Sequence, residues 1–324
     1  MRVSLVHNAK AGGKAPRRRD IQALLEEFGH EVAHSVGKKD EWKSLLEDPG
    51  DLVVVAGGDG TVGAVARRMI RHEAPIAVLP LGTANNIARA LGVEGSIREA
   101  IASWTVARAV SLDLGIATGS WGKTWFVEGF GLGLLATCMA QLHAQDKKSP
   151  AKKEDQAFKL FRDRLAVSGL AADYRPLSLK GSLDDQDISG EFLLMHAMNI
   201  RSIGPGLELA PQANPADGQL DFVFLPVERR AAFIDYLAAL REDQQGTPPV
   251  EIRRGRRLRL AGNGYDVHID DRLMRTEAAP PDAHLDIEIG IDAQAVRMLV
   301  PMGVPAIEVM KTDATRTAPV LLEA

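Results

Sequence analysis

The stretch Val53–Thr61 contains the residue types best suited to chemistry in this sequence. It reads Val-Val-Val-Ala-Gly-Gly-Asp-Gly-Thr, so an apolar run typical of a strand ends in three glycines around Asp59. Glycines let a ligand approach the backbone closely, and the free N–H groups at the start of a following helix attract phosphate. A carboxylate beside phosphates is repelled unless it holds Mg²⁺ or accepts a proton from an incoming hydroxyl. The predicted phosphate contacts are Gly57, Gly58, Gly60 and Thr61.

A simpler interpretation of this stretch is a tight turn in which Asp59 caps the helix. It explains the acid and one glycine but gives no reason for the other two. The segment Gly58–Gly63 also fits G-x-G-x-x-G, a motif of dinucleotide-binding folds that requires an acid about 20 residues further on. The chain reads Leu-Pro-Leu-Gly over residues 79–82, without that acid, so we exclude a dinucleotide site.

A second cluster, Leu79–Arg89, repeats this layout, because an apolar run is followed by Gly82 and then by small and polar residues that open a helix. Adjacent parallel strands end at one crevice, where ligands bind. Thr83 and Asn85 are therefore expected to converge with the first cluster on one triphosphate. Either residue could also be a plain N-cap.

The end of the first apolar run, Val3–Val6, offers one more candidate. The segment from Asn8 to Ala15 resembles a phosphate-binding P-loop, but Asn stands in place of the first glycine and Ala in place of the Ser or Thr that binds Mg²⁺. We therefore exclude a P-loop. Asn8 stays a candidate for lining a nucleotide pocket, and a plain turn explains it equally well.

The first third of the sequence alternates strand and helix patterns. Apolar residues recur at helical spacing over Arg17–Phe28 and again between Val62 and Ile70. Repeated strand–helix–strand units predict a parallel sheet with helices on both faces, over a first domain of residues 1–112. The predicted strands are Val3–Val6, Glu31–Val36, Asp51–Ala56 and Ile76–Leu79.

The pattern changes after about Val110. Short segments alternate between apolar and polar residues, which predicts a mostly antiparallel β-sandwich over residues 113–300. Two helical stretches interrupt it, near Lys153–Ala172 and Glu228–Arg241. Residues 301–324 are expected to pack back on the first domain and to fray at the end.

Composition limits the class of protein. The 324 residues carry a net charge of −4 and one cysteine, which predicts a cytoplasmic protein and argues against a nucleic-acid binder. The apolar run Gly129–Gln145 is too short and too polar to cross a bilayer. The basic stretch Arg253–Arg259 could touch anionic lipid headgroups, but an exposed edge strand is the favoured interpretation.

Taken together, these motifs resemble the diacylglycerol kinase catalytic-domain family, which includes bacterial lipid kinases, sphingosine kinases and ceramide kinases. The resemblance rests first on Gly57–Thr61 followed by Pro80–Asn86. It continues in Ser111–Gly115, which looks like an Asp-containing strand of the family. The second half adds an Asn, Gly-rich, Pro, Asp-Gly-x-Leu-Asp order at Asn199, Gly204–Gly206, Ala210-Pro211 and Asp217–Asp221.

The resemblance implies ATP-dependent phosphorylation of a lipid hydroxyl, diacylglycerol-like first and sphingoid or ceramide second. It implies ATP and Mg²⁺, and an NAD kinase- or phosphofructokinase-like first domain. Asp59 would be linked to Mg²⁺ or act as a base, Thr83 would contact phosphate, and Asp113 would belong to the magnesium network. The lipid substrate would be met at a membrane surface by transient contact without a transmembrane segment, and homo-oligomerisation stays open.

Three residues depart from the family pattern. Asn86 stands where many members have Asp, and Glu128 stands where Asn is usual. Arg272 occupies the place of a Glu thought to activate the acceptor, and arginine stays protonated. The remaining candidates for the catalytic base are Asp59, Asp270 and Asp271.

Two alternative functions remain open at this point. One is a kinase of the NAD kinase superfamily that acts on a soluble hydroxyl compound. The other is a nucleotide-binding regulatory module without turnover, which the departures at Asn86 and Arg272 motivate.

Overall fold

The computed structural model describes residues 1–11, 15–37, 41–148, 156–242, 244, 246–261, 265–274 and 287–302. The chain forms two compact units. The first contains Met1–Asp113, Pro215–Asp217 and the described residues from Ala293 onward, and the second contains Leu114–Asn214 and Gly218–Asp292. Residues 293–300, which the sequence assigns to the second domain, thus cluster with the first unit. The expectation for the C-terminal tail beyond Met302 lies outside the described residues.

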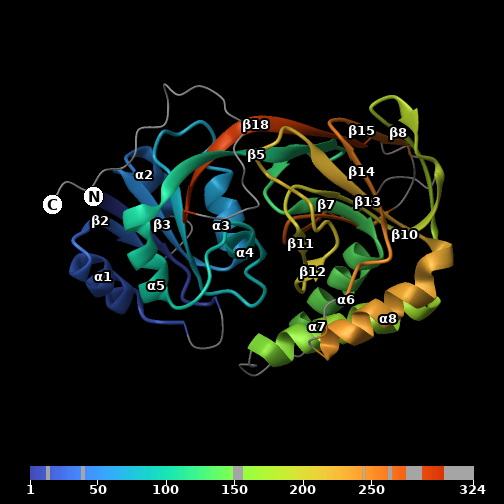
Figure 1. Ribbon diagram of the computed structural model, residues 1–324, viewed down its shortest axis with the longest axis horizontal. Helices are drawn as coiled ribbons and strands as arrows, with labels where there is room; N and C mark the ends of the chain where they lie inside the picture. Colours follow the sequence, from blue (N-terminus) through green and yellow to red (C-terminus); the bar gives the residue numbers. More distant parts are fainter. Residues whose placement is uncertain are drawn as a thin grey trace. The chain divides into compact units, whose positions relative to one another are not determined.

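The first unit is built on a parallel sheet with the strand order β2-β1-β3-β4. Most of this unit is drawn in blue to teal in Figure 1. Its strands are β1 Arg2–His7, β2 Glu31–Val36, β3 Leu52–Gly57 and β4 Ile76–Pro80. The central strand β3 is buried along its whole length, as its run of β-branched residues predicts. After β1 the chain continues to β2 on one side, whereas after β3 it continues to β4 on the other side. With right-handed crossovers, this reversal puts α1 on the opposite face from α2 and α3. In sheets of this kind, ligands bind beyond the carboxyl ends of the strands near such a reversal.

The helices of the first unit are short. They are α1 Arg18–Glu27, α2 Trp42–Glu47, α3 Asp59–Ala66, α4 Asn86–Ala90 and α5 Ile97–Ala102, followed by a 3₁₀ turn at Ser103–Val106. Helix α5 begins at a capping box, in which Ser96 accepts from the amide of Glu99 and the Glu99 side chain accepts from the amide of Ser96.

The second unit is an antiparallel sandwich, as the alternating patterns predict. One half of the sheet contains β7 Gly129–Gly133, β10 Gly190–Met198, β13 Leu220–Pro226, β14 Glu251–Gly255, β16 Val267–Ile269 and β17 Arg272–Met274. The other half contains β5 Arg108–Gly119, β6 Gly122–Phe126, β8 Leu177–Leu183, β9 Gln186–Asp187, β15 Leu258–Ala261 and β18 Ile287–Val300. A core that includes Phe130, Phe222, Leu179 and Ile289 lies between the halves. A separate small hairpin joins β11 Ser202–Ile203 to β12 Leu207–Glu208.

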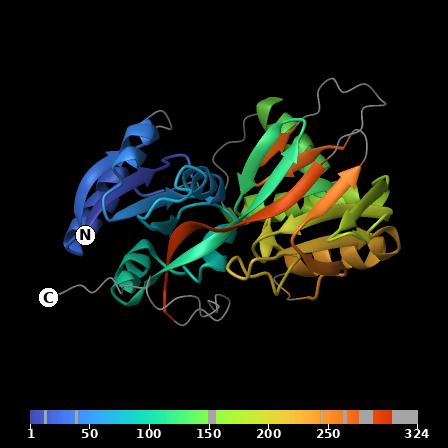
Figure 2. The ribbon, with the colours of Figure 1, turned by 90° about the horizontal axis from the view of Figure 1, so that it is seen from above.

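Two long strands take part in both units. Strand β5 pairs with β18, and the two lie side by side in Figure 2. The first residues of β18 pair antiparallel with β15, and its later residue Met298 pairs parallel with Ile76 of β4. The change in pairing partner explains why the end of β18 belongs to the first unit.

Three helices cover the outer face of the β7-β10-β13 layer. They are α6 Leu134–Lys148, α7 Gln156–Asp173 and α8 Arg230–Arg241, and they pack with this face in a second core. Helices α7 and α8 lie where the sequence predicts helices, whereas α6 is an additional helix that begins inside the apolar run Gly129–Gln145 and ends beyond it at Lys148. Among the described residues, no helix combines the length and the hydrophobicity needed to span a membrane.

Candidate functional site

Two loops meet where the neighbouring strands β3 and β4 end. Gly57 is in register with Pro80, and the amide of Leu81 donates to the carbonyl of Gly57 over 2.9 Å. The next residues approach so closely that a Cβ on Gly82 would lie 2.6 Å from the Cα of Gly58, and one on Gly58 would lie 2.9 Å from the Cα of Gly82. Both positions therefore require glycine, because any side chain would collide with the opposite backbone.

Asp59 is the first residue of α3, yet its side chain reaches the next helix. Its Oδ1 accepts a hydrogen bond from the amide of Ile87 over 2.9 Å, so it caps α4. Burial raises the pKa of Asp59, and the amides of Ile87 and Asn86 together with the charge of Arg89 oppose that rise. The simple interpretation in which Asp59 caps its own helix is wrong, because α3 receives no side-chain cap.

Asn85 closes the second loop. It adopts a left-handed conformation with φ of 50°. Its Oδ1 accepts from the amide of Gly82 over 2.8 Å, and its Nδ2 donates to the Gly82 carbonyl over 2.9 Å. The side chain thus clamps the loop that contains half-buried Thr83, and it gives no hydrogen bond to the start of α4.

Asn8 and Thr61 tie the end of β1 to α3. The Nδ2 of Asn8 donates to the Oγ1 of Thr61 over 2.8 Å, and the amide of Asn8 donates to the Ala56 carbonyl over 2.9 Å. Thr61 is buried, and a Cβ on Gly57 would lie 2.7 Å from its Cβ. Direct contacts therefore link the predicted residues Asn8, Gly57, Gly58, Asp59, Thr61 and Asn85 into one group.

Asp113 forms hydrogen bonds with two other segments of the first unit, at Pro215 and Gln294. This buried carboxylate accepts from the amide of Gln294 over 2.7 Å, and its own amide donates to the Pro215 carbonyl over 2.7 Å. Gln294 has a left-handed φ of 52°. The hydrogen bond that its amide donates to Asp113 helps to stabilise this conformation. In the described part of the chain, no three His, Cys, Asp or Glu side chains gather in a way that could hold a metal ion.

In the second unit, Asp270 is held by the backbone. It occupies the two-residue turn between β16 and β17, with φ of 51°. Its Oδ1 accepts from the amides of Val127, Glu128 and Gly129 over 3.0, 2.9 and 3.3 Å. Asp271, the other half of the turn, is exposed, as is Arg272. The structure thus distinguishes a buried, bonded acid from an exposed neighbouring one.

A buried histidine pair lies beside this turn, and sequence reasoning did not find it. His196 of β10 and His268 of β16 both pair with Gly131 of β7, and their Nε2 atoms are 2.9 Å apart. Nδ1 of His268 lies 3.1 Å from the Asp270 carbonyl, which can only accept, so we assign the proton of His268 to Nδ1. His196 then donates through Nε2 to His268.

Burial lowers the pKa of both histidines. The pKa of His268 falls to about 4, and that of His196 falls well below its usual range, with the neighbouring His268 as a second cause. Gly131 makes the pair fit, because a Cβ there would lie 2.1 Å from Nε2 of His196 and 2.5 Å from Nε2 of His268. One pattern could have revealed the pair. A glycine on a central strand has a histidine directly opposite it on each of the two neighbouring strands.

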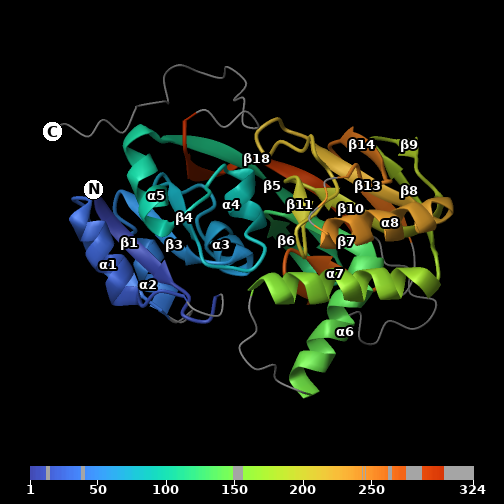
Figure 3. The ribbon, with the colours of Figure 1, turned by 60° about the horizontal axis from the view of Figure 1, so that its bottom comes forward.

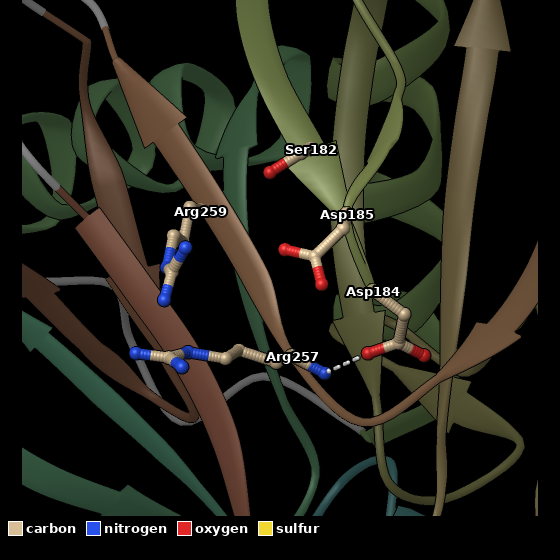
Figure 4. Close-up of a pocket in the computed structure, with 5 residues that line it drawn as sticks. All are labelled: Ser182, Asp184, Asp185, Arg257 and Arg259. Carbon is tan, nitrogen blue, oxygen red and sulfur yellow. Dashed lines mark hydrogen bonds between the residues drawn. The ribbon is translucent and has the colours of Figure 1, made fainter.

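A polar recess lies on another part of this unit, lined by Ser182, Asp184, Asp185, Arg257 and Arg259 (Figure 4). Its charges are compensated. Arg257 and Arg259 both pair with Glu288, at 2.9 and 3.8 Å, and Asp184 accepts from the amide of Arg257 over 2.8 Å. The recess therefore lacks the unbalanced positive charge of a phosphate site. Arg253 and Arg254 lie on β14, which pairs only with β13 among the described strands, as the edge-strand interpretation predicts. For Arg259 that interpretation is wrong, because β15 pairs with both β8 and β18.

Comparisons with known proteins agree with both units. Residues 2–117 match the diacylglycerol kinase catalytic domain family, and residues 153–297 match the YegS C-terminal NAD kinase beta sandwich-like domain family. A protein named probable lipid kinase YegS-like from Pseudomonas aeruginosa is 29% identical over 94% of this chain and 96% of its own length. Another of that name, from Pseudomonas syringae pv. syringae, is 31% identical over 72% of this chain and 75% of its own length.

Solved structures share the fold. A diacylglycerol kinase structure from Bacillus anthracis superposes with a TM-score of 0.64 and 19% identity, over 94% of this chain and 98% of that one. The family resemblance predicted from the motifs and the two-part fold predicted from the patterns are thus confirmed. The chain belongs to the family of YegS-like lipid kinases, which join a diacylglycerol kinase catalytic domain to an NAD kinase-like β-sandwich.

Proposed function

We propose that this protein transfers the terminal phosphoryl group of ATP to the hydroxyl of a lipid, with a diacylglycerol-like acceptor first and a sphingoid or ceramide acceptor second. Membership of the lipid kinase family supports the reaction class. The observation that carries the proposal within this chain is the backbone contact of Gly58 and Gly82 at the ends of β3 and β4, directly beside Asp59. Two glycine loops next to one acid and a helix start suit a triphosphate.

Hydrogen bonds within the protein hold the two glycine loops. Asn85 clamps Gly82, Asp59 fixes the start of α4, and Asn8 fixes Thr61. Phosphoryl transfer depends mainly on positioning and on neutralising charge, so amides that need no rearrangement lower its barrier. In this proposal the amides of Gly58 and Gly60, together with the hydroxyl of Thr83, bind phosphate oxygens.

Asp59 suits a Mg²⁺ ion as a single protein ligand. One of its oxygens is oriented by the Ile87 amide, and a carboxylate retains further lone pairs for a hard cation. Phosphate oxygens and water would supply the other ligands of the Mg²⁺ ion. The ion would neutralise charge on the transferred group. The family resemblance supports a positioning role for Asp113, whose carboxylate accepts the amide of Gln294, in the outer part of this network.

This proposal favours two of the three candidates for the catalytic base. Three amides already bond Oδ1 of Asp270, so this carboxylate is held by the backbone and is less free to take a proton from a substrate. Asp271 is better suited to accept the proton of the acceptor hydroxyl because it is exposed. Asp59 is better suited because burial raises its pKa. Asp270 then acts by fixing the turn that carries Asp271.

The test incubates the purified chain with labelled ATP, Mg²⁺ and a mixed lipid extract, and then separates organic from aqueous products. Label in the organic phase is expected, with a loss of about 100-fold or more in Asp59→Asn and none in Asp20→Asn, an exposed acid of α1. Label confined to water-soluble product would favour the soluble-acceptor kinase. ATP binding without any labelled product would favour the regulatory module.

A further inference from the structure

Helix α7 exposes large apolar side chains along one face. Phe158, Phe161 and Leu165 keep 56%, 44% and 49% of their surface exposed. Spacings of three and four residues put them on one side of the helix, and exposed Gly169 and Ala172 continue the same line. We call Phe158, Phe161 and Leu165 the α7 apolar face. An amphipathic helix normally exposes its polar side, so this arrangement is unusual.

The opposite side of α7 already has its packing partners. Val167 and Ala171 are buried in the core that α7 shares with α6 and α8. Figure 3 shows α7 along the outside of this unit, beside those two helices. The α7 apolar face is therefore not needed to hold the helix in place, and an exposed group of large apolar side chains marks an interaction site.

The charges of α7 favour an anionic partner. Its first half, which carries the apolar face, contains Lys159, Arg162 and Arg164 but only one acid, Asp163. Arg162 pairs with Asp163 at 3.0 Å and with Asp146 at 3.9 Å, and Arg164 donates to the carbonyls of Pro205 and Leu240. The basic side chain exposed beside Phe158 is therefore Lys159. Aromatic and aliphatic side chains flanked by basic ones are typical of helices that lie in a lipid interface.

The size of the face argues against a second copy of the chain. Large apolar side chains expose roughly 150–250 Å² each when free, so three that are about half exposed offer on the order of 300 Å². A stable protein–protein interface takes roughly 800 Å² from each partner. A patch of the smaller size is sufficient for shallow insertion among lipid headgroups and acyl chains.

We propose that the α7 apolar face inserts into the surface of an anionic lipid bilayer, with Lys159 contacting headgroup phosphates. This inference rests on the proposed function, because a lipid acceptor is presented by such a surface. It assigns the membrane contact to α7 and not to the basic stretch on β14 and β15, whose arginines Arg254, Arg257 and Arg259 have acidic partners at Asp221 and Glu288.

The test measures co-sedimentation of the full-length chain with vesicles of phosphatidylcholine, with and without phosphatidylglycerol, in the absence of nucleotide and of any acceptor. The double variant Phe158→Ser/Phe161→Ser is expected to lower the partition coefficient about tenfold or more, since burial of one large apolar side chain accounts for at least one decade. Lys159→Gln is expected to lower it about fivefold, and only on vesicles with phosphatidylglycerol.

The matched control is Val106→Ser/Ile252→Ser, which removes two exposed aliphatic side chains elsewhere and should leave partitioning unchanged. Thermal unfolding by circular dichroism establishes that each variant is folded. No vesicle binding by the parent chain, or equal binding by the phenylalanine variant, would overturn the proposal. Self-association of the parent chain that the phenylalanine variant abolishes would also overturn it, in favour of a second copy.

A separate assay with a short-chain acceptor dispersed in detergent distinguishes the two proposals. Phosphorylation there, without vesicle binding, would overturn the docking inference and leave the proposed function standing. Vesicle binding through the α7 apolar face without phosphorylation of any lipid would support the docking inference and contradict the proposed function.

Discussion

The carboxylate of Asp59 accepts a hydrogen bond from the amide of Ile87, with 2.9 Å between Oδ1 and N. The acid that opens α3 therefore caps the neighbouring helix α4 and joins the two glycine loops. This bond gives Asp59 a fixed orientation before any ligand arrives. It also gives the residue a structural role that can be measured apart from catalysis.

Asp59→Asn should stabilise the fold while it abolishes transfer. Burial raises the pKa of Asp59 above its ordinary value of 3.8, so the charged form costs the folded state free energy. The contribution of Asp59 to stability is then most favourable below 3.8, and it falls as pH rises through the raised folded pKa. Asn keeps an acceptor oxygen without the charge, so its Tm should exceed that of the parent chain at neutral pH. A lower Tm for the variant at neutral pH would contradict this account.

Gly82→Ala should damage the phosphate loops. The added methyl would lie 2.6 Å from the Cα of Gly58 and 2.7 Å from Oδ1 of Asn85, so one loop must move. We expect a loss of about 1–3 kcal/mol in the free energy of unfolding by urea denaturation. ATP affinity, measured by titration calorimetry, should also fall about tenfold. Gly290→Ala, where no atom lies within 4 Å of the new methyl, is the control.

Asp270→Asn and Asp271→Asn should separate positioning from chemistry. Asn at 270 keeps an oxygen for the three amides that bond Oδ1, but it removes the charge and turns an NH₂ group towards the Val127 amide in place of Oδ2, so we expect the free energy of unfolding to fall by about 2 kcal/mol. Asp271→Asn should leave stability unchanged and lower kcat if that exposed acid takes the proton. Urea denaturation and initial rates measure the two effects separately. Equal stability of the Asp270 variant and the parent chain would show that the amide bonds contribute little.

Gly131→Ala should be among the most destabilising single methyl additions in the second unit. The methyl would lie 2.1 Å from Nε2 of His196 and would force the histidine pair apart. We expect about 3 kcal/mol of lost stability, the upper end of the usual cost of overpacking. Gly169→Ala adds the same group to an exposed position of α7 with no atom within 4 Å, and should stabilise the chain by about 1 kcal/mol. Similar Tm values for the two variants would refute the packing argument.

The histidine pair should make the fold sensitive to acid. Burial lowers the pKa of His268 to about 4 and lowers that of His196 as well, from an ordinary value of 6.5. Their neutral forms therefore contribute stability that is fully present above 6.5 and is lost as pH falls towards about 4. In the double variant His196→Leu/His268→Leu, the free energy of unfolding should decline less steeply over that range. An unchanged slope would mean that other groups cause the acid sensitivity.

The sequence by itself determined the two-part fold and the position of the glycine loops. The apolar run before Gly57 is buried over its whole length as β3, and the alternating segments of the second half form an antiparallel sandwich. These features are local, because strand periodicity and glycine requirements act over a few residues. Helix α6 was missed because its mixture of small, apolar and polar residues gives no clear helical stripe.

Only the tertiary structure decided which atoms the functional residues contact. Asp270 bonds amides more than 140 residues away, and His196 meets His268 across a separation of 72 residues, above a glycine of a third strand. Such contacts depend on the register of strands that are distant in sequence, and a shift of one residue would turn each side chain to the other face. Residue types can therefore suggest an acid for catalysis, while strand register determines whether that acid faces substrate or backbone.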